Sequence, residues 1–260
     1  MPTEGTTTPA TVGPDAKAAD GPVVVVIPAF NESAVLPELL PRVRATLPEA
    51  EILVVDDGST DATSRVARAA GVLVARHPIN LGYGAAIQTG YLYALRRGAR
   101  AVLQMDADGQ HEPRSALVLL EELEHGADLV LGSRFLSGSR IYRAPLARRI
   151  GMHLFAAISG AILGRRITDP TSGFQALSPR LARFYAEGLF FPPDFPDADV
   201  LIRVGLAGFR VVEVPVDMYE KDGPSIHSGA RPVYYVMKML VTIVLLLTLP
   251  RRRMTVGSSQ

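Results

Sequence analysis

The chain has 260 residues, of which 48% are hydrophobic and 20% are charged, and its formal net charge is +1. This size and composition suit one globular α/β domain with a substantial core. The sequence contains no cysteine, which excludes disulfide bonds and thiolate chemistry. Any bound metal must therefore be held by oxygen or imidazole ligands, and this points to a hard cation.

The chain begins with residues 1–20, which are rich in Thr, Ala, Pro, Gly and Asp and predict a disordered tail. This tail has no hydrophobic stretch of the kind that a secretory signal requires. We expect the folded domain to span residues 21–230.

Short apolar runs predict buried strands along this domain. The first run covers residues 23–27, is β-branched throughout and ends at Pro28; the others are residues 52–55, 72–75, 101–105, 129–131 and 211–216. Stretches of helical character separate the first five runs. This alternation predicts an open, mostly parallel sheet with right-handed crossovers and helices on both faces.

Polar residues follow three of the predicted strands, at the edge where open parallel sheets bind ligands. They are Asn31 and Glu32 after the first strand, residues 56–59 after the second, and Asp106, Asp108 and Gln110 after the fourth. We expect the three clusters to converge on one site.

Asp106 and Asp108 lie two residues apart, so their carboxylates project to the same side if the chain stays extended. Together they could hold Mg²⁺ or Mn²⁺, which favours oxygen ligands and fills its remaining positions with phosphates and water. An isolated Asp-x-Asp is more often a solvated turn. The position after a buried strand and the nearby Gln110 and His111 favour a metal site.

The second cluster contains adjacent acids, Asp56 and Asp57. A helix cap explains Ser59 or Thr60. It does not explain two neighbouring carboxylates, which repel each other unless each has a ligand or a hydrogen-bond donor. Hydrogen bonds to a base and a ribose would satisfy them.

A glycine-containing loop at residues 80–84 precedes a predicted helix that runs through Leu95. Its glycines could bring backbone amides close to a pyrophosphate at the positive end of the helix. A plain helix-entry loop explains the pattern equally well, because the rest of a dinucleotide fingerprint is missing.

Residues 134–168 are basic and contain no Asp or Glu. The arginines are Arg134, Arg140, Arg143, Arg148, Arg149, Arg165 and Arg166, and residues 150–163 between them form an apolar helix candidate. Such a segment suits an anionic membrane surface or a lipid phosphate, although a core helix with arginines at its ends is the alternative. Nucleic acid is a poorer partner, since no aromatic platform accompanies the arginines.

Asp197 and Asp199 precede another apolar helical stretch, so either could be an N-terminal cap. Either could also be a general base. A hydroxyl acceptor would need such a base, whereas a phosphate acceptor is already anionic.

The C-terminus repeats the basic and apolar theme. Residues 233–249 are apolar apart from Lys238 and two threonines, and three arginines follow at residues 251–253. The segment is borderline in length for a membrane span. We expect residues 231–250 to form an apolar helix that associates with a membrane or mediates homo-oligomer formation, and residues 251–260 to form a basic, flexible tail.

Four segments in register carry a family resemblance. Residues 24–32 (VVVIPAFNE), 54–61 (VVDDGSTD), 104–111 (QMDADGQH) and 132–134 (GSR) resemble the inverting family-two glycosyltransferases with the GT-A fold. Residues 169–174 (DPTSGF) are similar to a segment of the dolichyl-phosphate mannose synthase and polyprenyl-phosphate glycosyltransferase branch. The resemblance runs from about residue 23 to about residue 240.

The resemblance implies a single GT-A (Rossmann-like) domain and assigns roles to individual residues. Around the nucleobase and ribose it places Pro28, Ala29, Asn31, Glu32 and Asp57. On the ribose or sugar side, and next to the metal, it places Asp106. It implies that Asp108 and Gln110 bind the metal and that Arg134 contacts a phosphate. It also implies that Asp199 is the catalytic base, with Asp197 beside it.

The segment after the last predicted strand departs from the family pattern. Relatives in the lipid-phosphate branch carry Arg-x-Arg there, whereas residues 219–225 read YEKDGPS. Lys221 can pair with a phosphate as a point charge but lacks the bidentate fork of arginine.

We therefore predict a metal-dependent, inverting transfer of a sugar from a UDP- or GDP-sugar, with Mg²⁺ or Mn²⁺ stabilising the leaving diphosphate. The favoured acceptor is polyprenyl phosphate, with the protein peripheral on the cytoplasmic membrane face. One alternative acceptor is a hydroxyl of a soluble glycan, glycoside or natural product, with Asp199 as base. A second alternative is a non-catalytic membrane adaptor that binds nucleotide-sugars.

Overall fold

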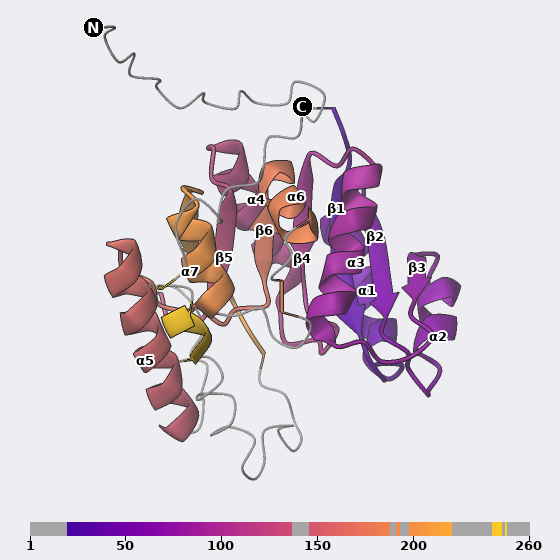
Figure 1. Ribbon diagram of the computed structural model, residues 1–260. Helices are drawn as coiled ribbons and strands as arrows, with labels where there is room; N and C mark the ends of the chain where they lie inside the picture. The colour runs from indigo at the N-terminus through magenta and orange to yellow at the C-terminus, as the bar shows by residue number, and fades with distance from the viewer. Residues whose placement is uncertain are drawn as a thin grey trace, which may run out of the picture.

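The computed structural model describes residues 20–136, 146–187, 191–192, 198–219, 241–245 and 248. The first half of the described chain alternates strands and helices: β1 Val23–Ala29, α1 Leu36–Thr46, β2 Glu51–Asp56, α2 Thr63–Ala69, β3 Leu73–Arg76, α3 Tyr83–Arg96 and β4 Ala101–Gln104. The second half contains η1 Pro113–Ser115, α4 Ala116–Glu124, β5 Leu129–Ser133, α5 Leu146–Leu163, β6 Gln175–Leu177, α6 Pro179–Glu187, α7 Ala198–Leu206 and β7 Val211–Pro215. Figure 1 shows these elements arranged around one twisted sheet.

The sheet has seven strands in the order β3-β2-β1-β4-β6-β5-β7. Each neighbouring pair is parallel except β4–β6 and β5–β6. The predicted mostly parallel α/β fold is thereby confirmed. The antiparallel β6 was not predicted, because three residues are too few to show a strand periodicity.

Two strand ends near the site differ from the prediction. β1 does not stop before Pro28 but continues to Ala29, which lies opposite Asp56 of β2. β4 ends at Gln104, and the chain turns over residues 107–109, with Gly109 at φ 75°. The extended backbone that would put both carboxylates of the Asp-x-Asp on one side is therefore not present.

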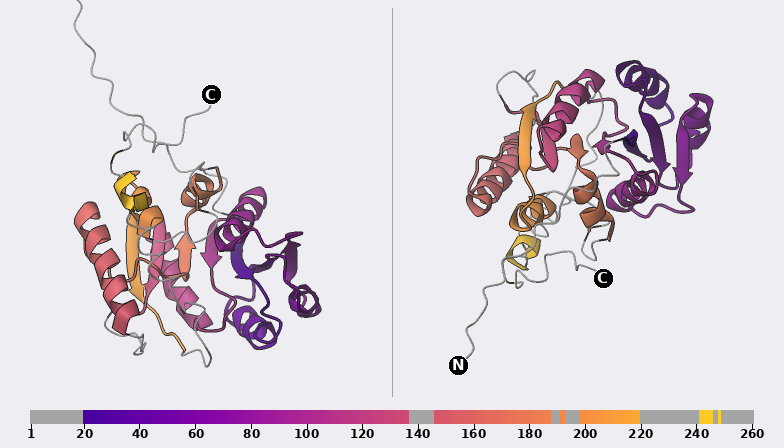
Figure 2. Two further views of the ribbon diagram at one scale, coloured as in Figure 1. Left: turned by 60° about the horizontal axis from the view of Figure 1, so that its bottom comes forward. Right: turned by 90° about the horizontal axis from the view of Figure 1, so that it is seen from above.

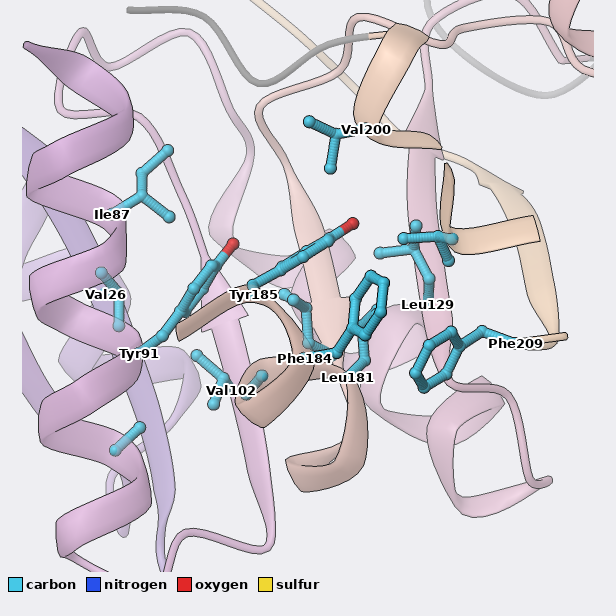
Figure 3. Close-up of a cluster of buried hydrophobic side chains, with 14 of the residues drawn as sticks. Val26, Ile87, Tyr91, Val102, Leu129, Leu181, Phe184, Tyr185, Val200 and Phe209 are labelled. Carbon is cyan, nitrogen blue, oxygen red and sulfur yellow. The ribbon is translucent and has the colours of Figure 1, made fainter. Parts of the chain in front are cut away.

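Alternate residues of β1 enter two separate cores, one on each face of the sheet. Val24 and Val26 pack with side chains of α3, α6 and α7, whereas Val25 and Ile27 pack with side chains of α1, α2 and α4. Figure 2 shows the helices on both sides of the sheet. In the first core, the aromatic side chains of Tyr91, Tyr185, Phe184 and Phe209 fill the space between α3, α6 and β5 (Figure 3).

Helix α5 packs as a core helix on one face. Phe155 and Ser159 are buried, while Leu154 is exposed. Ile243, in the helical residues 241–245, joins Phe155 and α7 in a third apolar cluster, so the C-terminal segment lies beside α5 and α7 (Figure 1).

Some of the predicted segments are only partly described. Residues 1–19 and most of the expected helix at residues 231–250 lie outside the described residues. Within the described part of the chain, every helix is too short or too polar to cross a membrane.

Candidate functional site

The loops that follow β1 and β2 are joined by hydrogen bonds at the carboxyl edge of the sheet. The backbone N–H of Asn31 donates to Ser59 Oγ at 2.9 Å, and Asn31 Oδ1 accepts from the Thr60 N–H at 2.9 Å. Asn31 adopts φ 59°, a left-handed conformation that asparagine tolerates better than most residues. The Glu32 N–H donates to Thr63 Oγ1 at 2.9 Å. Two of the three predicted polar clusters therefore form one surface.

The side chain of Asp56 is fully buried and satisfied within the protein. Its carboxylate accepts from the Ser59 N–H at 2.8 Å and from the Ser64 hydroxyl. Burial alone would raise the pKa of this carboxyl, but the hydrogen bonds from Ser59 and Ser64 outweigh it and lower the pKa. Asp56 therefore stabilises the β2–α2 loop as a buried anion.

Asp57 holds the loop that leads into α3. Its carboxylate accepts from the Leu81 and Gly82 N–H groups, both at 2.9 Å, and lies 2.7 Å from His77 Nδ1. His77 Nε2 lies 2.9 Å from Thr89 Oγ1 on α3. Each acid of the adjacent pair thus has donors, as the electrostatic argument required, but these donors belong to the protein. The contact of Asp57 with a base or ribose stays a prediction.

Pro28 and Ala29 are buried at the end of β1, below the joined loops. Beside them Gly58 has φ 73°, and a Cβ at this position would lie 2.4 Å from the Ile79 carbonyl carbon. Only glycine allows the loop after β2 to approach the loop between β3 and α3 this closely. Because Pro28 and Ala29 are buried, a ligand at this edge would contact backbone groups and the side chains of the loops.

Asp106 is held from three segments. Its Oδ1 accepts from the Tyr83 hydroxyl at 2.5 Å, and its Oδ2 lies 3.3 Å from His111 Nε2. A Cβ on Gly173 would lie 2.3 Å from Oδ2, so a larger residue there would displace the Asp106 carboxylate. Burial alone would raise the pKa of Asp106, but hydrogen bonds from His111 and Tyr83 and the positive charge of Arg134 lower it below the usual value.

Asp108 and Gln110 lie in the turn that follows. Asp108 Oδ1 accepts from the Gln110 N–H at 3.0 Å, which closes the turn. Gln110 Nε2 donates to the Tyr219 carbonyl at 3.2 Å, and the Tyr219 N–H donates to the Gln110 carbonyl at 2.7 Å. The turn after β4 is therefore tied to the chain after β7, and Oε1 is the atom with which the Gln110 side chain could bind a cation.

The donor set in this turn fits a cation that arrives with a phosphate ligand. Among the described residues, no group of three or more His, Asp or Glu side chains could hold a metal ion by itself. Mg²⁺ is usually bound by one or two carboxylates together with substrate phosphates and water, without a protein cage. One carboxylate of Asp108, the amide oxygen of Gln110 and the nearby Asp106 match that pattern.

Arg134 lies at the end of β5 in a buried ion pair with Asp169. Its Nε and Nη2 donate to the two carboxylate oxygens of Asp169, each at 2.6 Å, and Asp169 is fully buried. Arg134 Nη2 also donates to Thr171 Oγ1 at 3.2 Å. The predicted phosphate contact of Arg134 stays untested; the observed geometry shows that this side chain fixes the loop at residues 169–174.

Asp199 lies in the first turn of α7 and is only 6% exposed. Burial raises the pKa of Tyr185, and the charge of Asp199 raises it further. Burial also lowers the pKa of Arg203, against the effect of Tyr185 and Asp199. Asp199 thus lies near the buried Tyr185 and the partly buried Arg203, and its charge acts to raise the pKa of both.

Several predicted residues fall outside the described part of the chain. They are Asp197, Lys221, Arg140 and Arg143, together with the side chains of Arg148 and Arg149. Conversely, Tyr83 and Gly173 lie in the segments 80–84 and 169–174, which the sequence pointed to without giving either residue a role of its own, and His77 was not singled out. Their contacts could not be predicted, because their partners lie on other elements.

The chain is similar to known glycosyltransferases. Residues 24–188 match the family model described as glycosyl transferase family 2. The chain is 34% identical over 235 residues to the polyprenol monophosphomannose synthase of Mycolicibacterium smegmatis, covering 85% of each chain. It is 34% identical over 219 residues to the undecaprenyl-phosphate mannosyltransferase of Micrococcus luteus, covering 80% of this chain and 88% of the relative.

A solved structure shares the fold at lower identity. Glucosyl-3-phosphoglycerate synthase of Mycobacterium tuberculosis, in complex with Mn²⁺ and UDP-glucose, superimposes with a TM-score of 0.66 at 20% identity. The match covers 89% of this chain and 80% of that one. At this identity the likeness establishes the fold.

Proposed function

Because the chain belongs to glycosyl transferase family 2 and is a glycosyltransferase, we propose that it transfers a sugar from a nucleoside-diphosphate sugar to polyprenyl phosphate with inversion. The observation that carries the proposal is the turn of Asp108 and Gln110 beside the oriented carboxylate of Asp106, at the sheet edge where ligands bind. The two relatives that are 34% identical to this chain, a polyprenol monophosphomannose synthase and an undecaprenyl-phosphate mannosyltransferase, support the lipid-phosphate acceptor.

On the donor side, the joined loops after β1 and β2 bind the nucleoside, with Asn31 and Glu32 at its edge. Asp108 and Gln110 would hold a divalent cation, which stabilises the negative charge of the leaving diphosphate when it is bound. Asp106, oriented by Tyr83 and His111, faces the ribose or the sugar. These residues position the anomeric carbon for attack.

On the acceptor side, a phosphate oxygen of the lipid attacks the anomeric carbon while the bond from that carbon to the diphosphate oxygen breaks. The nucleoside diphosphate leaves with the bonding electron pair, and the configuration inverts. A phosphate is already anionic at neutral pH, so the step needs no general base. A hydroxyl acceptor would need one, and Asp199 would have to supply it from its buried position in α7.

The proposal includes attachment to the cytoplasmic face of a membrane, where a lipid phosphate is presented. Val241, Val244 and Leu245 are exposed on the helical residues 241–245, and three arginines follow at residues 251–253. Apolar side chains followed in the sequence by arginines suit an anionic membrane surface. The same exposed side chains would also suit a contact between two copies of the chain.

A thermal-shift titration tests the donor side. We expect Mn²⁺ or Mg²⁺ alone to change the melting temperature little, and a nucleoside diphosphate with the cation to raise it by roughly 5–10 °C at a hundredfold excess over Kd. The cation would bridge the turn and the diphosphate, so each ligand strengthens binding of the other. The diphosphate with the largest cation-dependent shift identifies the base.

Nucleoside monophosphates provide the control, since they lack the second phosphate that the cation would bridge. They should give a small shift that is the same with and without the cation. If no nucleoside diphosphate gives a cation-dependent shift, the proposed metal and donor site is wrong.

A further inference from the structure

A chain of hydrogen bonds leads from the buried core of the domain to the partly exposed carboxylate of Asp106. The Tyr91 hydroxyl donates to Gln104 Oε1 at 2.5 Å. Gln104 Nε2 donates to the Tyr83 hydroxyl oxygen at 3.2 Å and to the Gly173 carbonyl at 3.1 Å. The Tyr83 hydroxyl in turn donates to Asp106 Oδ1 at 2.5 Å. Tyr91, at the start of this chain, lies in the aromatic core shown in Figure 3.

The direction of the Tyr83 hydrogen bond follows from its partners. Because Gln104 Nε2 is a donor, the Tyr83 oxygen accepts from it and must use its own proton for Asp106. The bond from Tyr83 to Asp106 is therefore charge-assisted, which makes it stronger than a bond between neutral groups.

The backbone of Tyr83 is anchored from the opposite side of the site. Tyr83 is the first residue of α3, directly after Gly82, whose N–H donates to Asp57. Asp57 lies at the end of β2, in the edge that the β1 and β2 loops form. Tyr83 thus connects the loop surface predicted to bind the nucleoside with the carboxylate predicted to face the ribose or sugar.

We propose that Tyr83 is a positioning residue for the donor: its hydroxyl fixes the Asp106 carboxylate in the orientation needed to bind the ribose or sugar. The proposal rests on the proposed function. Asp106 needs such a restraint because its carboxylate is partly exposed, with 29% of the side chain accessible, so it could otherwise rotate into solvent. His111 restrains Oδ2 from the other side, at the longer distance of 3.3 Å.

The test compares Tyr83→Phe with Tyr93→Phe. Tyr93 lies on the same helix, and its hydroxyl donates to Glu51 Oε2 at 3.0 Å, away from Asp106. Each substitution removes one hydroxyl that donates to a carboxylate. We expect Tyr83→Phe to lower kcat/KM for the donor by about 10- to 100-fold, as is typical when a group that orients a ligating residue is removed. Tyr93→Phe should keep donor kcat/KM within about twofold.

A positioning role also predicts which parameters change. The donor KM should rise in Tyr83→Phe while the acceptor KM stays near that of the wild type. The melting temperature should fall by a similar amount in both Tyr→Phe variants, because each loses one hydrogen bond to a carboxylate. In an Asp106→Asn background, Tyr83→Phe should have little additional effect, because the residue acts through Asp106. Equal losses of donor kcat/KM in the two Tyr→Phe variants would overturn the proposal. So would a loss in the double variant equal to the sum of the losses, as free energies, in Tyr83→Phe and Asp106→Asn.

Crystal structures of both variants without ligand give a readout that does not depend on activity. Asp106 should rotate away from its wild-type orientation in Tyr83→Phe and keep that orientation in Tyr93→Phe. An unchanged Asp106 in Tyr83→Phe would overturn the positioning role. If the wild type transfers no sugar from any donor, the proposed function fails, while these structures still decide whether Tyr83 orients Asp106.

Discussion

Sugar transfer is expected to fall at least about a thousandfold when Asp108 is replaced by alanine, which corresponds to about 4 kcal/mol of lost transition-state stabilisation. Asp108 is the proposed carboxylate ligand in the turn after β4, and the described residues offer no alternative cluster of three acidic or histidine side chains. Without Asp108 the divalent cation would bind poorly, and the negative charge that develops on the leaving diphosphate would lose its main counter-charge. The measurement is the initial rate at saturating cation and donor.

A second substitution at the same residue separates charge from turn geometry. The side-chain oxygen of asparagine can still accept from the Gln110 N–H, as Asp108 Oδ1 does, so Asp108→Asn should keep the turn and the melting temperature. It should nevertheless lose most of the activity and the cation-dependent thermal shift. Near wild-type turnover in both variants would show that the metal assignment is wrong.

Breaking the Arg134–Asp169 ion pair is expected to destabilise the protein by about 3–5 kcal/mol, because each single substitution leaves an uncompensated buried charge. This corresponds to a fall in melting temperature of roughly 6–20 °C. The suitable variants are Arg134→Met and Asp169→Asn, since Asn can still accept from the Arg134 backbone N–H, which lies 3.1 Å from Asp169 Oδ2. Thermal and denaturant unfolding measure the effect.

The double variant is the control for this ion pair. With both charges removed, it should be less destabilised than the sum of the single variants, and close to the milder of them. Arg100→Ala, which breaks an ion pair with the exposed Glu124, should change the melting temperature little. If the losses in unfolding free energy of the two single variants add up in the double variant, Arg134 and Asp169 have no energetic coupling.

The strands and the sheet edge at which the polar clusters lie could be predicted, because both follow from local patterns. Runs such as residues 23–27 and 52–55 are apolar and rich in β-branched residues, and the sheet buries them on both faces. The polar residues after β1, β2 and β4 lie at one edge because parallel strands end together there. The predicted helix through Leu95 is also present as α3.

The partners of the site residues could not be predicted, since they come from distant parts of the chain. Asp57 pairs with His77 and the α3 entry loop, and Arg134 pairs with Asp169 across 35 residues. Such pairings depend on tertiary packing, which no local periodicity encodes. For the same reason, the sequence showed that Asp56 and Asp57 need donors but did not reveal that the donors are protein groups.

The orientation of Asp106 and Asp108 could not be predicted from their spacing alone. Their spacing suggested two carboxylates on one side of an extended chain, but β4 ends at Gln104 and the chain turns at Gly109. Asp106 therefore lies against Tyr83 and His111, while Asp108 closes the turn. This separation supports different roles for the two acids.

The most direct test of the account is the transfer of a labelled sugar from the donor to polyprenyl phosphate in anionic vesicles, with polyprenol and soluble hydroxyl acceptors assayed in parallel. We predict that the label enters the lipid fraction as an inverted sugar phosphate only when polyprenyl phosphate and a divalent cation are both present. Label in polyprenol or soluble acceptors alone, with none on polyprenyl phosphate, would contradict the account.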